Sequence, residues 1–114
     1  MFQAHLAVVT SREDVESFKL SLLADRKIAK ATHNMLAYRI ITPQGSTLYD
    51  NDEDGEAGAG RRLSELLQLM NANNVAVMVS RWYGGIQLGP DRFRHISNAA
   101  REVLEANGFG RSPK

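Results

Sequence analysis

The spacing of apolar residues along the chain predicts four strands and three helices. Residues 2–9 are apolar at every second position, which is the period of a strand with one buried face. Residues 62–72 instead place their apolar side chains three and four positions apart, on one stripe of a helix. The same criteria give further strands at 34–42, 46–50 and 75–79, and further helices at 11–30 and 90–107.

Local signals at the ends of these segments support the assignment. Ser11 is followed three residues later by Asp14, which approximates a capping box at a helix start. Pro43 and Gly45 stand where a tight turn between two strands favours them. Pro90 suits the first position of the last helix, because its ring already has the backbone angle of a helix.

The order β-α-β-β-α-β-α defines the expected fold. This order predicts an α+β protein, built as a two-layer α/β sandwich with its helices on one face of the sheet. The run 75–79 (VAVMV) is apolar at every position, as in a strand that is covered on both faces. We therefore expect this strand to be buried.

The composition is that of one folded domain. The chain has 114 residues, of which 43% are hydrophobic and 24% charged, enough to bury a core without a metal or a disulfide. Its net charge of +1 gives no global attraction to nucleic acid or to a membrane. The absence of cysteine excludes disulfides and thiolate chemistry. We expect a single domain over 1–110, a disordered tail at 111–114 and a cytoplasmic location.

The segment after the buried strand carries the residues that are best suited to contact a partner. Arg81, Trp82 and Tyr83 place a guanidinium and two aromatic rings where the strand emerges at an edge of the domain. Gly84 and Gly85 then permit a sharp turn with positive φ or a close backbone approach. These five residues predict a contact surface.

The acidic segment 50–55 (DNDEDG) matches the first half of a calcium-binding EF-hand loop. The twelfth position of such a loop must provide a bidentate glutamate, and here it is Arg61. The segment before it also reads as a strand rather than a helix. A solvated acidic turn explains the run equally well, so we expect no calcium site.

The segment 55–62 (GEAGAGRR) has the glycine spacing of a phosphate-binding loop but lacks its working side chains. Arg61 replaces the lysine that grips the phosphates, and Arg62 replaces the serine or threonine that holds magnesium. A nucleotide hydrolase is therefore not expected. Two interpretations remain open: the glycines let the chain turn closely into a helix, or the helix N-terminus and its arginines hold a smaller anion.

Two glycine-rich turns lead into helices, so both helix N-termini can face a shared cleft. For Arg81 the sequence leaves two interpretations open. Either it forms an ion pair with Asp54 or Glu56 that fixes the loops, or it holds a ligand. The candidate binding residues of the cleft are Asp54, Glu56, Arg61, Arg81, Tyr83, Gly84 and Gly85, with His33 at the entry of a strand.

Catalytic and metal-binding patterns are not found in the sequence. His5, His33 and His95 lack the spacing of a zinc motif, and no Ser-His-Asp or paired-carboxylate arrangement can be identified. We therefore predict no enzyme, no metal and no cofactor. A basic bias near the C-terminus, together with 81–83, offers nucleic-acid binding as an alternative function. This bias consists of Arg92, Arg94, Arg101, Arg111 and Lys114.

Two long segments carry a family resemblance. DGEAGAGRRLSELL at 54–67 and NVAVMVSRWYGGIQLGPDRFRHISNAAREVL at 74–104 strongly resemble the Impact family. The opening FQAHLAVV and the segment ATHNMLAYRI are also similar to that family, so the resemblance covers nearly the whole chain. The wording SRWYGGIQLGPDRF is typical of its eukaryotic branch.

The resemblance implies a fold similar to the second domain of ribosomal protein S-five and a regulatory role. Eukaryotic members are implied to restrain the kinase that phosphorylates initiation factor two under amino-acid starvation, by competing for its ribosome-associated activator. Some are also linked to monomeric actin. Members usually carry an RWD domain ahead of the Impact domain. These 114 residues contain none, and a strand that starts at Phe2 indicates a piece of a longer protein.

We therefore expect a non-enzymatic regulatory module, a repressor in translational control that acts through protein contacts. Arg81 and Arg61 are the candidates for binding an anionic group, and Tyr83 is the candidate for stacking. Asp54 and Glu56 are the candidates for orienting the partner. The alternative is an RNA- or ribosome-binding module, and an enzyme that uses the acidic loop ranks last.

Overall fold

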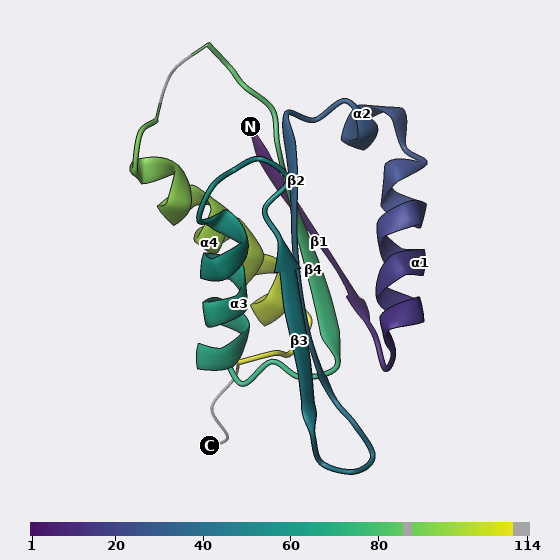
Figure 1. Ribbon diagram of the computed structural model, residues 1–114. Helices are drawn as coiled ribbons and strands as arrows, with labels where there is room; N and C mark the ends of the chain where they lie inside the picture. Colours follow the sequence, from purple (N-terminus) through teal and green to yellow (C-terminus); the bar gives the residue numbers. More distant parts are fainter. Residues whose placement is uncertain (86–87, 111–114) are drawn as a thin grey trace.

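The computed structural model describes residues 1–85 and 88–110, and it places one antiparallel sheet between helices on both sides (Figure 1). The mixed α/β class and the expected order are confirmed, with one short helix added after the first. The predicted tail 111–114 lies outside the described residues. The elements are β1 (Phe2–Val8), α1 (Arg12–Leu23), α2 (Arg26–Ala29), β2 (His33–Ile41), β3 (Thr47–Asp52), α3 (Ala59–Leu69), β4 (Val75–Arg81) and α4 (Asp91–Ala106).

The strand β4 lies inside the sheet, whose strands follow the order β1-β4-β2-β3. It pairs antiparallel with β1 on one side and with β2 on the other, so that Met78 is opposite both His5 and Leu36. All seven of its residues are buried. The expectation of a buried strand that is covered on both faces is confirmed.

The first face of the sheet packs against α3 and α4. Val75, Val77 and Val79 of β4 share this face, because side chains alternate along a strand, and they belong to one core cluster with both helices. The predicted stripe on α3 is buried there through Leu63, Leu66 and Leu67, and α4 contributes Ile96, Ala100 and Leu104.

The second face of the sheet packs against α1, on the side opposite α3 and α4 (Figure 1). Ala76 and Met78 alternate with the valines of β4, and they form a second core cluster with Val15 of α1. The expectation that all helices lie on one face is therefore corrected. A strand that is apolar at every position needs cover on both faces, and α1 provides the second cover.

The first predicted helix is two helices in the structure. The cap at Ser11 is confirmed, because its hydroxyl oxygen accepts a hydrogen bond from the N–H of Asp14 at 3.1 Å. The helical segment predicted at 11–30 is interrupted near Asp25. The carboxylate of Asp25 accepts a 2.8 Å hydrogen bond from the N–H of Lys27 and so caps α2. Capping side chains therefore define both starts.

The ends of two elements determine where the candidate site lies. β4 continues past its apolar run to Arg81, which still pairs with Phe2 of β1 and His33 of β2. The helix α3 begins at Ala59 rather than at the predicted residue 62. Because β4 extends to Arg81, this residue is held within the sheet instead of on a free loop.

Truncation of Met78 to alanine should destabilise the protein by about 2–5 kcal/mol, because its side chain is fully buried on the α1 side of the sheet. Denaturant unfolding followed by circular dichroism measures this change in free energy. Leu69→Ala is the matched control, because Leu69 is 84% exposed. It should change the free energy by less than about 0.5 kcal/mol. Equal effects of the two substitutions would contradict the two-sided core.

Candidate functional site

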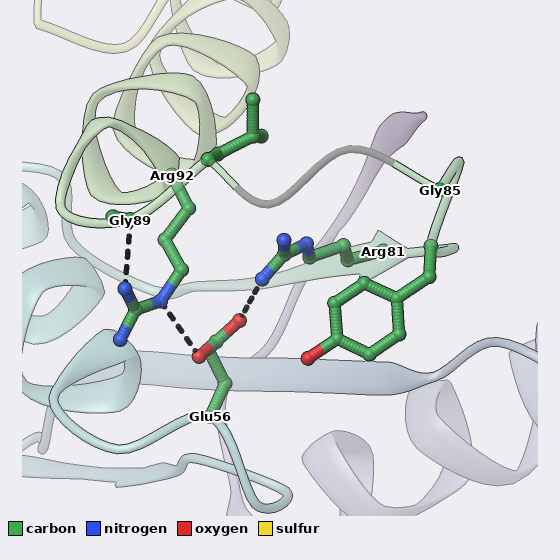
Figure 2. A pocket seen from close by; sticks show the side chains of 7 residues that line it. Glu56, Arg81, Gly85, Gly89 and Arg92 are labelled. Atoms are coloured by element: carbon green, nitrogen blue, oxygen red, sulfur yellow. Dashed lines mark hydrogen bonds and ion pairs between the residues drawn. The ribbon is translucent and has the colours of Figure 1, made fainter.

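The carboxylate of Glu56 is buried and joins three segments of the chain (Figure 2). Glu56 is 5% exposed and lies in the loop between β3 and α3. Its Oε2 accepts a hydrogen bond from Nη1 of Arg81, the last residue of β4. Its Oε1 accepts a 2.9 Å hydrogen bond from Nε of Arg92, in the first turn of α4. Two arginines therefore share one carboxylate.

The sheet and two aromatic rings fix the position of Arg81. Its guanidinium carbon lies 4.6 Å from the centre of the Tyr83 ring and 5.5 Å from that of Phe2, distances at which a ring attracts a cation. Its carbonyl oxygen accepts a 2.8 Å hydrogen bond from the N–H of Thr32. Of the arrangements that the sequence left open, the structure thus contains the ion pair with Glu56.

Arg92 is a site residue that the sequence indicates only as part of the basic bias near the C-terminus. Its Nη1 donates a 2.7 Å hydrogen bond to the carbonyl oxygen of Gly89, and its guanidinium carbon lies 4.4 Å from the centre of the Phe93 ring. A signal was present in the sequence. An arginine in the first turn is disfavoured by the positive end of the helix dipole, and a nearby carboxylate offsets this. Glu56 provides that carboxylate. Arg61 and Arg62 also lie in the first turn of α3, so the signal does not single out Arg92.

The carboxyl group of Glu56 is held in its ionised form. Burial alone would raise the pKa of Glu56, because it disfavours the charged form. The hydrogen bonds and positive charges of Arg81 and Arg92 outweigh burial, and they hold the pKa of Glu56 below its ordinary value. Glu56 is therefore negatively charged at neutral pH.

A pocket of about 590 Å³ adjoins this ion-pair cluster. In Figure 2 the guanidinium groups of Arg81 and Arg92 both point toward Glu56. The volume is in the range of small-molecule and side-chain binding sites. The described residues that line the pocket are Glu56, Arg81, Tyr83, Gly85, Leu88, Gly89 and Arg92.

His33 and Asp54 hold the loop of Glu56 without lining this pocket. Nδ1 of His33 lies 2.7 Å from the carbonyl oxygen of Asp54. Because a carbonyl oxygen only accepts hydrogen bonds, this nitrogen carries the proton. Nε2 of His33 is 3.9 Å from Oε2 of Glu56. The Asp54 carboxylate accepts a 2.7 Å hydrogen bond from the N–H of Asn34, so both residues position the loop.

Arg61 lies outside this pocket, which corrects the expectation that it shares a cleft with Arg81. Because α3 begins at Ala59, Arg61 falls in its first turn, where it pairs at 3.0 Å with Glu65 one turn later. Gly84 is also outside the described lining, whereas Gly85 belongs to it. Arg61 instead borders a second hollow of about 360 Å³, which is lined by Gly58, Arg61, Arg62, Glu65 and Phe93.

Two glycines in the segment 55–62 suit the backbone there, one through its conformation and one through a close contact. Gly58 precedes α3 with a φ of 87°, a left-handed conformation that favours glycine. A Cβ on Gly60 would lie 2.3 Å from Oδ1 of Asn51, so any side chain there would require that of Asn51 to move. Both positions support the interpretation in which the glycines let the chain turn closely into the helix.

The described residues contain no group of three histidine or carboxylate side chains placed to hold a metal ion. His5, His33 and His95 lie on three separate elements, β1, β2 and α4. His95 stacks on Phe2, with ring centres 5.4 Å apart. Within residues 1–85 and 88–110, no helix has both the length and the apolar character needed to cross a bilayer.

Acid should remove the stabilisation that Glu56 provides. Its pKa in the folded protein lies below the ordinary value of 4.5, so the unfolded chain binds more protons as the pH falls below that value. Stability is therefore fully present above this range and is lost as the pH falls through the folded-state pKa. Glu56→Gln should be less stable than the wild type at about pH 7 and should lose less stability on acidification.

Denaturant unfolding at about pH 7 and about pH 3 measures this difference. Glu65→Gln is the control, because its carboxylate is 54% exposed and pairs with Arg61 on the surface. It should keep the acid dependence of the wild type. If Glu56→Gln and the wild type lose equal stability between the two pH values, Glu56 is not the group responsible.

Comparison with known proteins gives a family for the chain. The family model of the Impact N-terminal domain matches residues 1–104. A "Protein IMPACT homolog" of Schizosaccharomyces pombe is 54% identical over 103 residues, which cover 90% of this chain and 37% of the relative. "Protein IMPACT" of Homo sapiens is 50% identical over 114 residues, which cover 99% of this chain and 36% of the relative.

Two solved structures share the fold. One is a protein described as the two-domain translational regulator Yih1, with 42% identity and a TM-score of 0.67 over 97% of this chain and 43% of that one. The other is described as a hypothetical protein and supports the fold alone, with 24% identity and a TM-score of 0.81 over 95% of this chain and 52% of that one. The chain thus spans a third to a half of the proteins that it matches. The family expected from the sequence is confirmed: this chain belongs to the Impact family.

Proposed function

We propose that this chain is a protein-binding module in the control of translation. Its relatives are named for the Impact family, and a structural neighbour is described as a translational regulator. The observation that carries the proposal is the pocket in which Glu56 fixes Arg81 and Arg92. Fixed arginines beside an aromatic ring are typical of recognition sites.

The chemistry of the pocket supports recognition rather than catalysis. A general acid or base works best with a pKa near the working pH, whereas the pKa of Glu56 is lowered and its oxygens accept bonds from two arginines. Arginine stays protonated and does not act as a base. The described lining residues include no serine, cysteine, lysine or histidine.

The finer proposal concerns the partner. In this proposal, the chain belongs to a cytoplasmic repressor of the kinase that phosphorylates initiation factor two. The repressor competes with the kinase for its ribosome-associated activator. Monomeric actin is a second partner. Residues 1–110 act as one domain. Arg81 and Arg92 provide hydrogen-bond donors, Tyr83 provides a ring for stacking, and Glu56 sets the geometry of both arginines.

RNA or the ribosome is the second candidate partner, and one observation favours it. The ring of Phe93 lies 4.4 Å from the guanidinium carbons of both Arg62 and Arg92. This contact joins the pocket to the second hollow, so cations and aromatic rings alternate across both. Cations interleaved with rings suit a single strand of nucleic acid.

Substitution of Arg92 by glutamine should weaken capture of the activator by about tenfold, because a charged hydrogen-bond donor is lost from the pocket. A quantitative pull-down measures this, with the chain alone and with the chain joined behind an RWD domain. Arg94→Gln is the matched control. Arg94 lies on the same helix with a side chain that is 67% exposed, and it pairs with Asp91.

Comparison of Arg92→Gln with Arg94→Gln distinguishes binding at the pocket from binding elsewhere on the surface. Equal loss with Arg92→Gln and Arg94→Gln would show that binding depends on the charge of the helix and not on the pocket. Failure to capture the activator with either form of the chain would count against the regulatory proposal as a whole.

Filter binding of single-stranded RNA over a salt series tests the second candidate. If phosphate contacts carry the interaction, the logarithm of the affinity should fall steeply with the logarithm of the salt concentration, with a slope of about −0.7 for each phosphate contacted. Arg62→Gln should reduce that slope, because Arg62 borders the second hollow. No binding at low salt would remove RNA as a partner.

A further inference from the structure

We infer that the pocket formed by Arg81, Arg92 and Tyr83 binds a carboxylate group of a protein partner. This inference rests on the proposed function, because it names the chemical group that the recognition site takes. The group is either the side chain of an acidic residue or a C-terminal carboxylate, and it enters a pocket that Glu56, paired with both arginines, also lines.

The charges in the pocket leave one positive charge without a partner. Arg81 and Arg92 carry two positive charges, and the ionised Glu56 offsets one of them. Arg81 is only 4% exposed, so water screens its charge poorly. The nearest other acid on α4, Asp91, pairs with Arg94 at 3.0 Å. The pocket therefore favours a ligand with a single negative charge.

The arginines also keep hydrogen-bond donors for such a ligand. A guanidinium has five N–H donors. Within the described residues, Arg81 donates one side-chain hydrogen bond, to Glu56, and Arg92 donates to Glu56 and to Gly89. No nitrogen of either arginine is among the solvent-inaccessible side-chain atoms that lack a partner. Hydrogen bonds among the described residues therefore leave donors of both arginines over for a ligand.

The start of α4 favours a carboxylate over a phosphate. Phosphate sites at helix starts use free backbone N–H groups. Here the N–H of Asp91 bonds the carbonyl oxygen of Leu88 at 3.3 Å, and that of Arg92 bonds Gly89 at 3.2 Å. The N–H of Phe93 bonds Pro90 at 3.2 Å. What remains is the planar guanidinium fork, which matches carboxylate and phosphate alike. The single positive charge that Glu56 leaves over then favours the monoanionic carboxylate.

The walls of the pocket favour a carboxylate on a polypeptide. The ring of Tyr83, which is 60% exposed, and the side chain of Leu88 give apolar contacts next to the charge. Gly85 and Gly89 add no side chain to the described part of the lining, so a peptide backbone can come close at these two positions. An acidic residue beside an apolar one meets both requirements.

NMR titration of the chain, following the arginine Nε–Hε signals, tests this inference with three probes at constant ionic strength. N-acetyl-glutamate α-amide presents a side-chain carboxylate, N-acetyl-leucine presents a terminal carboxylate beside an apolar side chain, and inorganic phosphate presents a dianion. One of the carboxylate probes should give saturable shifts of Arg81 and Arg92 and should bind more tightly than phosphate. The carboxylate probe that binds more tightly shows whether the partner provides an acidic side chain or a C-terminus.

Two variants sharpen the test. Arg92→Gln should weaken binding of the carboxylate probe by about tenfold or more, whereas Arg94→Gln should leave that affinity unchanged. Glu56→Gln adds one net positive charge to the pocket, so it should tighten phosphate binding by about tenfold. A folding defect cannot produce that gain.

Three results would overturn the inference. The first is that the wild type binds phosphate more tightly than both carboxylates. The second is that Arg92→Gln and Arg94→Gln lose equal affinity for the carboxylate probe. The third is that no probe gives saturable shifts. If neither carboxylate probe binds while capture of the activator still depends on Arg92, the pocket does not recognise a carboxylate and the proposed function stands. If the probes bind but capture is independent of Arg92, the proposed function falls instead.

Discussion

The buried carboxylate of Glu56 is the constraint on which the rest of the site depends. It holds together the loop before α3, the end of β4 and the first turn of α4. A buried carboxylate is costly to desolvate without partners, and a buried arginine is equally costly without a carboxylate. Glu56 can therefore not be removed without leaving the buried Arg81 uncompensated, whereas Arg92 is partly exposed and can be changed with less harm.

The same cluster relates stability to recognition. One carboxylate cannot neutralise two guanidiniums, so the arrangement that fixes the loops also leaves a positive charge beside an aromatic ring and a pocket. The fold keeps this charge in place, because the last residue of β4 carries it in the middle of the sheet. A module of an Impact protein can thus present a fixed binding group without a mobile arm.

The sequence predicted the core well and the site in part, for physical reasons. Alternation and helical periodicity identify which side chains are apolar, so β4 and the stripe on α3 were foreseen. Periodicity does not tell which sheet face a helix covers, although the unbroken run 75–79 already required cover on both. The Arg81–Glu56 pair was foreseen as one alternative, but Arg92 was missed and Arg61 was misplaced. Glu56 and Arg92 lie 36 positions apart, and only the packing of α4 brings them together.

The ion pair between Glu56 and Arg92 should stabilise the folded domain. A double-mutant cycle with Glu56→Gln, Arg92→Gln and the double variant, from denaturant unfolding at neutral pH, measures their coupling directly. We expect a favourable coupling of about 1–3 kcal/mol, because the two groups form a partly buried, hydrogen-bonded ion pair. Additive effects, with a coupling near zero, would contradict it.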